Sequence, residues 1–429
     1  MQDDFVVDAV TAEPELAVPR PQPKGWFSRG VAGIGSASLL ADVGHEVPTA
    51  LLPSLLTTTL GAPASALGLI EGVSDGLAGL ARFGGGALSD DPGRRRAIAV
   101  GGYTTTAVLS SVTGAATSAW QVGVLRAGAW AARGLRVPAR NALLADIVDP
   151  AVYGRAYGFE RAMDNLGAIF GPVLAIGLVA LVGTRAAIGI SVIPGLLATA
   201  AILYAIRHTE RPKARDKVKI RIQVRPVLQG PLRSLFAGIG AFEFGNCAAT
   251  LLILRATELL EPGRSHAAAA TTALWLYVTY NAAATVTSVP AGRHADRTVP
   301  RRTLTIGVIA FGIAYAGLTR DTHSWLALTP WFVFAGIGIG CVETAEHAAV
   351  AAKAPAEIRG SAFGLLAAVQ SFGNFAASGI AGVLWTVASP SWAFAYLTGW
   401  MILAAAILMR LPPRPSSGEI SDHVLKTKS

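Results

Sequence analysis

The amino-acid sequence predicts an all-α, polytopic membrane protein with twelve transmembrane helices, arranged as two pseudo-symmetric bundles of six helices. Three observations support this fold class. The composition is strongly apolar, short phrases of sequence recur at one fixed interval, and the loops between apolar segments alternate in basic charge. Together they indicate a duplicated helical membrane module.

The composition excludes an ordinary soluble domain. Hydrophobic residues make up 52% of the 429 residues and charged residues only 15%, and the mean hydropathy is +0.48. Soluble globular proteins carry about 25% charged residues. The chain is therefore expected to lie in a lipid bilayer, and its net charge of +9 has to be understood from the distribution of basic residues along the loops.

A short charged phrase occurs twice, 206 residues apart. Asp90 follows Gly86 by four residues in the first copy, and Asp296 follows Gly292 by four residues in the second. The same interval of 206 residues relates two further pairs, residues 154–158 (Gly-Arg-Ala-Tyr-Gly) with 360–364 (Gly-Ser-Ala-Phe-Gly), and Gly167 with Gly373. Internal repeats of apolar segments at a fixed interval are typical of transporters.

Twelve apolar segments approach or exceed the length of a membrane-spanning helix, which takes roughly 20 mostly apolar residues. In chain order they are about 30–56, 64–88, 97–117, 119–147, 155–182, 185–207, 232–256, 268–291, 302–319, 323–352, 357–388 and 391–410. Six and six fit the repeat. The predicted organisation is a tail (1–28), an N-terminal bundle (29–207), a linker (208–231), a C-terminal bundle (232–410) and a second tail (411–429).

The loops between these segments alternate in basic charge. Arginine and lysine follow the second, fourth, sixth, eighth and tenth segments, whereas the loops after the first, third and eleventh carry no basic residue. Because basic loops remain in the cytoplasm, both termini and both tails are expected there. The longest basic run, residues 207–225, is interpreted as a linker facing the anionic inner leaflet and not as a nucleic-acid binding segment.

Ionisable residues inside the predicted membrane segments are confined to certain helices. The third, sixth, eighth, ninth and twelfth segments have essentially none in their cores. Because a charge in hydrocarbon is costly, the charged helices are expected to face a cavity or a partner, and the uncharged helices can face lipid. The candidate residues for proton coupling or a substrate cavity are Asp42, His45, Glu46, Glu71, Asp75, Arg126, Arg133, Asp164, Glu243, Glu343, Glu346 and His347.

The first segment carries the densest of these clusters. Asp42, His45 and Glu46 share one helix face because of their spacing, and Pro48 and Pro53 are expected to bend or break the helix after them. Two interpretations are open: a proton relay coupled to substrate movement, or static salt bridges that hold helices together. The same three side chains are also candidate metal ligands, although the sequence offers no clear fourth ligand.

Residues 26–410 resemble a twelve-helix transporter of the major facilitator superfamily. Residues 86–96 resemble the superfamily signature between the second and third helices, with Asp91 where a basic residue is usual, and residues 292–302 resemble a second copy that keeps Arg297. The resemblance implies a gate that locks the outward-facing state on the cytoplasmic side. The gate residues implied are Gly86, Asp90, Gly93, Arg94, Gly292, Asp296 and Arg297.

The fifth segment resembles a motif associated with antiporters of this superfamily, and the matching residues are Gly158, Gly167, Gly171 and Pro172. Small residues let helices approach closely, and the proline supplies a bend. The resemblance places the chain near a bacterial, proton-coupled, drug-antiporter-like subgroup. It implies a central site formed by helices 1, 4, 7 and 10, with helices 2, 5, 8 and 11 lining the interface between the bundles.

The predicted function is a proton-coupled exporter, an antiporter of small organic or amphipathic molecules, working by alternating access as a monomer in the bacterial cytoplasmic (inner) membrane. Protonation of Asp42, Glu46 or Glu243 would alternate with substrate binding. The alternatives are transport of a metal ion, of a metal chelate or siderophore, or of an organic anion that contacts Arg126 or Arg133. No cofactor is expected, and no enzyme, since the sequence after His45-Glu46 lacks the second histidine of a zinc-protease motif.

Overall fold

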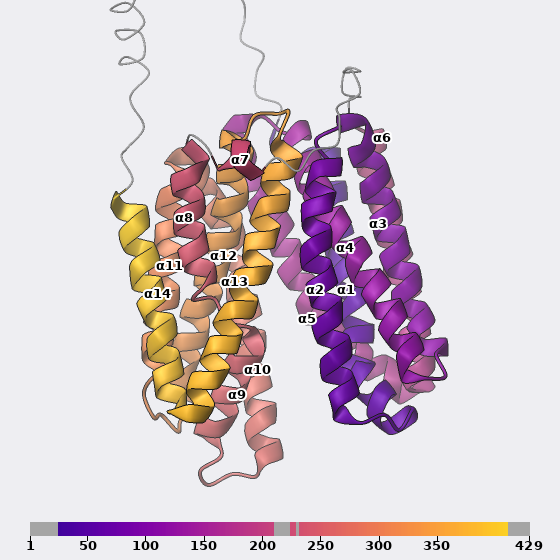
Figure 1. Cartoon of the computed structure of the whole chain (residues 1–429), viewed down its shortest axis with the longest axis vertical. Coiled ribbons are helices and arrows are strands. Elements are labelled where there is room, and N and C mark those ends of the chain that lie inside the picture. The colour runs from indigo at the N-terminus through magenta and orange to yellow at the C-terminus, as the bar shows by residue number, and fades with distance from the viewer. Residues whose placement is uncertain (1–24, 210–223, 229–230, 411–429) are drawn as a thin grey trace, which may run out of the picture.

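The computed structural model describes residues 25–209, 224–228 and 231–410. The predicted tails up to residue 24 and from residue 411, and most of the predicted linker, lie outside the described residues. The described residues form helices and no strands, which confirms the all-α prediction. Figure 1 shows two helical bundles side by side, one from each half of the chain.

The N-terminal bundle contains the first six long helices of the chain. They are α1 (Arg29–Pro53) with the π-helical turn η1 (Ser54–Thr59), α2 (Ala64–Leu88), α3 (Pro92–Val112), α4 (Ala119–Ile147), α5 (Tyr153–Ile190) and α6 (Val192–Arg207). Two short 3-10 turns, η2 (Thr113–Ala115) and η3 (Pro150–Val152), connect them. Asp91 begins α3 by accepting the N–H of Gly93 at 2.9 Å, a standard N-cap.

The C-terminal bundle contains the remaining helices. They are α7 (Val224–Val227), α8 (Pro231–Glu243), α9 (Ala249–Leu260), α10 (His266–Arg297), α11 (Pro300–Leu318), α12 (Trp325–Lys353), α13 (Arg359–Val387) and α14 (Pro390–Arg410). Proline stands at the first position of α3, α8, α11 and α14. Its fixed φ suits the start of a helix, where its missing N–H costs nothing.

The seventh predicted segment is broken, in contrast to the single helix expected over about 232–256. Helix α8 ends at Glu243 and α9 begins at Ala249. An unwound backbone inside a membrane needs partners from neighbouring helices, and α13 supplies them: the amide of Asn374 donates to the carbonyl of Asn246 at 2.8 Å, and Ser378 Oγ accepts the N–H of Ala248 at 2.8 Å.

The fifth and sixth predicted segments join at a bend. Helix α5 continues to Ile190 through Gly183, whose φ of 78° lies in the left-handed region that glycine tolerates.

Helix α1 runs through Pro48 as far as Pro53, and the chain then adopts a π-helical turn. The prolines therefore change the helix type after Pro53 without ending α1 at Pro48.

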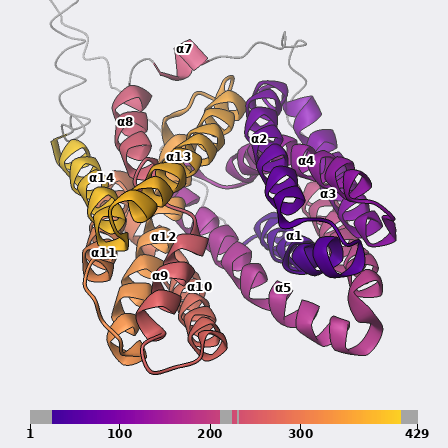
Figure 2. The ribbon, with the colours of Figure 1, turned by 60° about the horizontal axis from the view of Figure 1, so that its bottom comes forward.

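The two bundles meet through α2 with α13 and through α5 with α10, which confirms the interface helices implied by the family resemblance. Figure 2 shows α5 running between the bundles, with α10 beside one part of it and α1 beside another. The loops 89–91, 148–152, 298–299 and 354–358 lie on one face of the structure. We call it the basic face because the helix ends beside these loops carry Arg94, Arg95, Arg96, Arg155, Arg297, Arg301, Arg302 and Arg359. The bundles meet there, near the top of Figure 1.

The separation between the bundles grows with distance from the basic face. Gly86, Gly79 and Gly72 lie at seven-residue intervals and therefore on one side of α2. A Cβ on Gly86 would lie 2.8 Å from α13 backbone atoms, one on Gly79 would lie 3.7 Å from the nearest α13 atoms, and one on Gly72 would have nothing within 4 Å. Helices α2 and α13 thus touch at the basic face and part towards the opposite face, and Figure 1 shows the two bundles separating in the same direction.

Candidate functional site

An arginine of α4 binds the charged cluster predicted on the first helix. Asp42 and His45 are each 5% exposed, and Arg133 contacts both, with one nitrogen 2.5 Å from His45 Nε2 and another 3.4 Å from Asp42 Oδ1. A guanidinium only donates, so Nε2 accepts and we assign the ring proton to Nδ1, which lies 3.4 Å from Asp42. Glu46 Oε1 lies 3.4 Å from His45 Nε2.

A second chain of contacts joins α2 to α4. Arg126 forms an ion pair with Glu71 at 2.7 Å and lies 4.0 Å from the centroid of the Trp130 ring. The indole N–H of Trp130 in turn donates to Asp75 at 2.8 Å. Glu71 is 38% exposed, although Arg126 is buried. The structure therefore brings the predicted residues of α2 and α4 together on the side where the bundles part.

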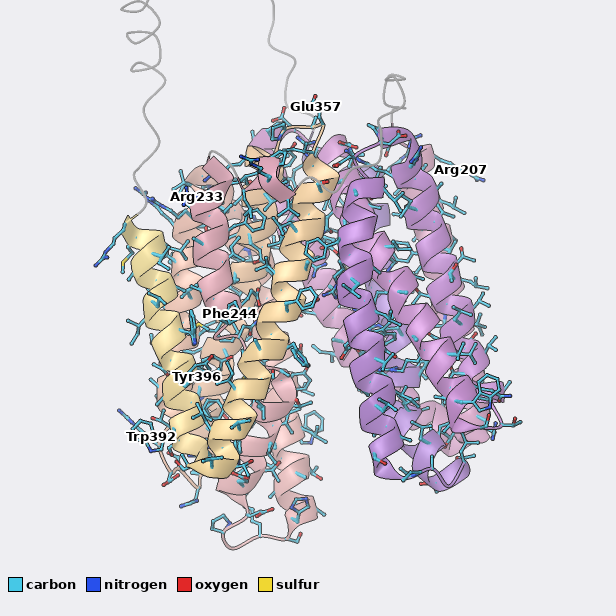
Figure 3. All side chains as sticks on the ribbon, viewed as in Figure 1. Arg207, Arg233, Phe244, Glu357, Trp392 and Tyr396 are labelled. Atoms are coloured by element: carbon cyan, nitrogen blue, oxygen red, sulfur yellow. The ribbon has the colours of Figure 1, made fainter. Side chains whose placement is uncertain are left out.

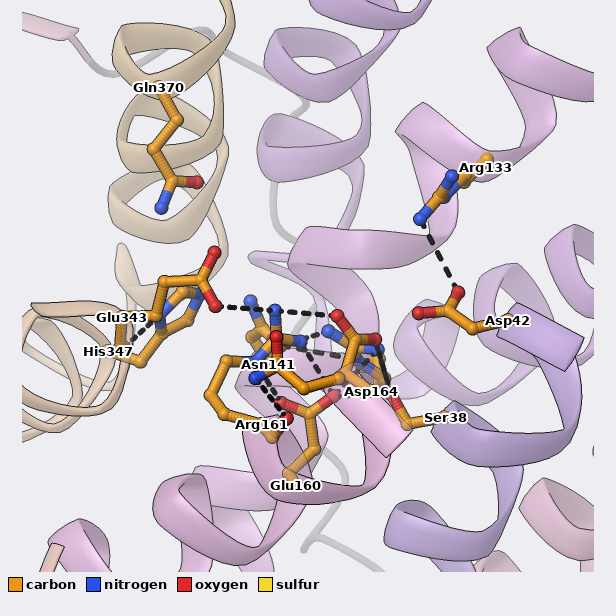
Figure 4. A network of polar contacts seen from close by, with 12 residues as sticks. Ser38, Asp42, Arg133, Asn141, Glu160, Arg161, Asp164, Glu343, His347 and Gln370 are labelled. Atoms are coloured by element: carbon orange, nitrogen blue, oxygen red, sulfur yellow. Dashed lines mark hydrogen bonds and ion pairs between the residues drawn. The ribbon is translucent and has the colours of Figure 1, made fainter. Parts of the chain in front are cut away.

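A buried ionic network joins α4, α5 and α12 (Figure 4). Glu160 accepts from Arg140 at 2.7 Å and from Arg161 at 2.6 Å. Arg161 also contacts Asp164 at 3.1 Å and reaches Glu343 of the other bundle at 3.9 Å. Two arginines thus face three carboxylates, and one of these carboxylates belongs to α12.

The C-terminal bundle holds its carboxylates differently. Glu346 is fully buried; the amide of Gln370 donates to its Oε1, and its Oε2 has no hydrogen-bond partner. Glu243 is 3% exposed and accepts from Asn246 at 3.1 Å. Gly373, one turn after Gln370 on α13, lies against Glu243. Within the described residues, neither carboxylate forms an ion pair with arginine or lysine.

His347, another of the candidate residues, lies in an aromatic environment. Its ring is 5.8 Å from that of Tyr157 and 6.0 Å from that of Phe363, and Nδ1 lies 2.6 Å from the backbone carbonyl of Glu343. The ring nitrogen therefore donates to that carbonyl, and the side chain is held between α5 and α13.

At the basic face, the aspartate of each Gly-x-x-x-Asp phrase binds the other repeated phrase, residues 154–158 or 360–364, in the opposite bundle. Asp90 of the N-terminal bundle accepts the N–H and the hydroxyl of Ser361, at 2.8 and 2.5 Å. Asp296 of the C-terminal bundle accepts the N–H groups of Gly154 and Arg155, at 2.6 and 3.1 Å, and the Arg155 side chain at 2.8 Å. Each aspartate thus binds the positive start of a helix in the other bundle.

A second set of ionic contacts supports the junction between α2 and α13, which, like the junction between α5 and α10, we call a seam. Arg95, which is 2% exposed, pairs with Asp146 at 2.5 Å, and Asp146 also contacts Arg359 of α13 at 3.3 Å. The predicted gate residue Arg94 instead pairs with its neighbour Asp91 at 3.2 Å. Arg95 was not among the predicted gate residues, and the sequence alone does not reveal which arginine of the loop is buried.

Two other predicted gate residues lie beside the seams. The N–H of Gly93 donates to Asp91 at the start of α3. Arg297 is exposed at the end of α10 and forms no ion pair within the described part of the chain. Gly86 and Gly292, in contrast, lie directly in the seams, against the backbones of α13 and α5.

The glycines of the antiporter-like motif let α5 approach two different helices. Gly158 lies against the α10 backbone, whereas Gly167 and Gly171 lie against Asp42 and Glu46 of α1. Any Cβ at these positions would collide with the facing atoms. The motif therefore fixes α5 against the helix that carries the charged cluster.

Sequence reasoning did not select Arg136 or Ser361. Arg136 is 3% exposed, lies 4.1 Å over the Tyr103 ring and has no ion pair within the described residues. Its position one turn after Arg133 was the available signal. For Ser361, the signal was that residues 360–364 repeat at the interval of the Gly-x-x-x-Asp phrase.

The comparisons with known proteins agree with this architecture. The family model of the Major Facilitator Superfamily matches residues 34–261 and 248–427. An uncharacterized MFS-type transporter of Methanocaldococcus jannaschii is 27% identical over 89% of this chain and 95% of its own length. An uncharacterized protein of Mycobacterium tuberculosis is 31% identical over 46% of this chain and 48% of its own length.

Two solved structures share the fold. The human organic anion transporter MFSD10 superposes with a TM-score of 0.68 and 17% identity, covering 89% of this chain and 99% of its own. A bacterial homologue of the iron transporter ferroportin, in an outward-facing state, superposes with a TM-score of 0.71 and 14% identity over the same shares. At these identities the likeness concerns the fold alone. The chain belongs to the Major Facilitator Superfamily and is a membrane transporter, not an enzyme.

Proposed function

We propose that this transporter is an exporter that exchanges protons for small organic molecules across the cytoplasmic membrane of a bacterium. Basic loops mark the cytoplasmic side, so the basic face is assigned to the cytoplasm. A structure closed at that face and open towards the other then corresponds to the outward-facing state. In alternating access the bundles would part at the basic face and close at the opposite face. The buried ionisable residues that lie between the two faces, which we call the charged layer, would then be reached from the cytoplasm.

The observation that carries the proposal is the pair of carboxylates Glu243 and Glu346. Both are buried, and their hydrogen-bond partners are the amides of Asn246 and Gln370. An ionised carboxylate buried without a cation is strongly destabilised, so each is expected to hold a proton in this conformation. A rearrangement that exposes them to the cytoplasm would release those protons.

The N-terminal bundle offers a different environment, suited to holding substrate. Glu71 and Glu46 are 38% and 26% exposed, whereas their partners Arg126 and His45 are buried. Trp130 adds an aromatic face between Arg126 and His45. An organic molecule with both apolar and polar groups can therefore contact aromatic surface and ion pairs in one place.

The two sites would be coupled through the network around Arg161, which contacts carboxylates of both bundles. Proton binding favours one facing state and substrate binding favours the other, and a difference in affinity between the states is all that exchange requires. A monomer contains every part of this cycle.

The test is transport by purified protein in proteoliposomes, with a panel of small organic compounds and an imposed pH gradient. Substrate movement should follow the gradient and be accompanied by opposite proton flux. Glu346→Gln should reduce gradient-driven accumulation by more than about tenfold, because a neutral amide cannot exchange a proton, while exchange of substrate at equal pH persists.

Arg410→Gln, at the exposed end of α14, is the control for insertion and activity. Transport that continues after the pH gradient is collapsed would rule out proton coupling. Equal gradient-driven accumulation by wild type and Glu346→Gln would exclude Glu346 as the coupling residue.

An organic anion is the second candidate substrate, and Arg133 favours it. Its side chain is 26% exposed and its carboxylate partner Asp42 lies 3.4 Å away, so an anion could reach and bind the guanidinium. Competition by organic anions that disappears in Arg133→Gln would support this alternative.

A metal ion is less well supported as the substrate. Asp42, His45 and Glu46 do lie together, but Arg133 donates to His45 Nε2. That nitrogen lone pair is the one a metal would need, and a cation beside a guanidinium is repelled.

A further inference from the structure

The basic face contains a cavity that lies outside the charged layer and extends beyond the contacts of Asp296. Its volume is about 270 Å³, and it is lined by Trp26, Arg155, Arg293, Asp296 and Arg297. The first two residues precede or begin helices of the N-terminal bundle, and the other three end α10 of the C-terminal bundle. The cavity therefore lies across the seam between α5 and α10.

The lining of this cavity has an excess of positive charge. Its three arginines face one aspartate, and Asp296 is already satisfied by Arg155 and two backbone N–H groups. Arg293 and Arg297 are exposed and form no ion pair within the described residues. Two guanidinium groups are thus available to a ligand, and the planar guanidinium is the side chain best suited to bind phosphate oxygens.

An apolar surface lies next to these arginines. Trp26 is in edge contact with Phe27 and Phe159, at ring-centroid distances of 5.4 and 6.3 Å, and Phe27 with Phe159 at 5.2 Å. Phe27 is 55% exposed. Exposed aromatic residues beside arginine are characteristic of the membrane–water interface. A free phosphate would use the arginines only, whereas a phospholipid would use both surfaces.

We propose that this cavity binds the phosphate of an anionic phospholipid from the leaflet at the basic face, with the acyl chains against Trp26 and Phe27. Basic pockets between transmembrane helices are established sites for such headgroups. The bound lipid contacts both bundles, so it stabilises the conformation in which the basic face is closed and is released when the seam opens.

The site can be tested with protein in nanodiscs of phosphatidylcholine alone or with phosphatidylglycerol. The pocket variant is Arg293→Gln with Arg297→Gln. The matched control is Arg207→Gln with Arg233→Gln, which removes equal charge from exposed positions on the same face (Figure 3). Retained lipid is counted by native mass spectrometry, and seam closure is followed by hydrogen exchange of the Gly154 and Arg155 amides, which donate to Asp296.

Wild type and control should retain one phosphatidylglycerol tightly and exchange these amides more slowly in its presence. The pocket variant should bind that lipid on the order of 30-fold more weakly, from about 1 kcal/mol for each basic side chain, and lose the protection. Equal retention by pocket and control variants would overturn the site. If inorganic phosphate slows exchange of the Gly154 and Arg155 amides of the wild type in phosphatidylcholine alone, the ligand is a soluble anion and the lipid assignment is wrong. Neither result depends on proton coupling.

Discussion

The two bundles place opposite chemistry at equivalent positions. Arg140 and Glu346 are 206 residues apart, as are Asp164 and Gln370. In the N-terminal bundle Arg140 lies 3.8 Å from Asp164, and in the C-terminal bundle Glu346 accepts a hydrogen bond from Gln370. The duplicated backbone therefore keeps one contact between equivalent positions but turns an ion pair into an amide–carboxyl pair.

The difference divides the work between the bundles. A buried cation with a carboxylate partner is a fixed element, because removing either charge leaves the other uncompensated. A buried carboxyl group beside an amide has no compensating cation, so it stays neutral while buried and can ionise once it is exposed to water. The N-terminal network is accordingly suited to holding helices and substrate, and the C-terminal pair to proton exchange.

The largest expected effect separates these two roles by stability. Glu160→Gln should lower the free energy of unfolding by about 3–5 kcal/mol, since it removes the carboxylate shared by two buried arginines. Glu346→Gln should change it by less than about 1 kcal/mol, because Gln370 can still donate to the new amide oxygen. Thermal unfolding of both variants in one detergent measures the difference. Equal losses would mean that the bundles do not differ in this way.

A smaller effect concerns the seams, where the bundles are expected to behave alike. Gly86→Ala and Gly292→Ala each add a Cβ against backbone atoms of the opposite bundle, and Gly76→Ala adds one with nothing within 4 Å. Overpacking costs about 1–3 kcal/mol, so the first two variants should shift the population about 5- to 150-fold away from closure at the basic face. Spin-label distances across that face measure the shift.

Gly76→Ala should leave those distances unchanged. A shift in only one of the two seam variants would show that one seam dominates closure and would extend the asymmetry of the charged layer to the gate.

The smallest expected effect compares the equivalent aspartates of the two seams. Asp296→Asn loses an ion pair with the partly exposed Arg155 and should weaken closure by about 1 kcal/mol. Asp90→Asn should not weaken it, because an amide oxygen can still accept the N–H of Ser361 and burial disfavours the charge of Asp90. The same spin-label distances rank the two variants. A larger loss of closure in Asp90→Asn than in Asp296→Asn would contradict the expectation that the ion pair with Arg155 makes Asp296 the stronger contact.

Asp90 also predicts a pH dependence. Burial raises the pKa of its carboxyl group above the ordinary value of 3.8, against the opposing hydrogen bonds from Ser361 and the charge of Arg95. The closed seam therefore binds a proton more tightly than a seam in which Asp90 is solvated. Closure should strengthen as pH falls towards 3.8 and weaken as pH rises through the raised pKa. This response should be absent in Asp90→Asn.

The class of fold could be predicted from the sequence, because the apolar composition indicates membrane helices and the 206-residue repeat indicates two equivalent bundles. The 206-residue repeat also identified the Gly-x-x-x-Asp phrase and the phrase at 154–158 and 360–364. It could not indicate that one phrase binds the other, since pairing depends on how two bundles are placed in space. The alignment of Asp164 with Gln370 was visible in the sequence, but the neutral partner of Glu346 required the structure.

Local signals also failed where tertiary contacts decide the outcome. The break after Glu243 is stabilised by Asn374 and Ser378 of α13, more than 120 residues away. No local propensity reports such a partner. Arg95 and Arg94 are adjacent and chemically identical, and only the packing of α3 against its neighbours determines that Arg95 is the buried one.

The crosswise contacts of the two aspartates have the geometry of a symmetric dimer contained in one chain. In an isologous interface the same surface patch serves both partners, so that residue i of one touches residue j of the other and the reverse. Asp90 with Ser361, and Asp296 with Arg155, satisfy this relation at the 206-residue interval. A separate six-helix unit carrying both phrases could form the same interface with a second copy of itself. When both copies belong to one chain, each seam can change independently of the other. The arginine at position 155, where the equivalent position 361 holds serine, is such a difference.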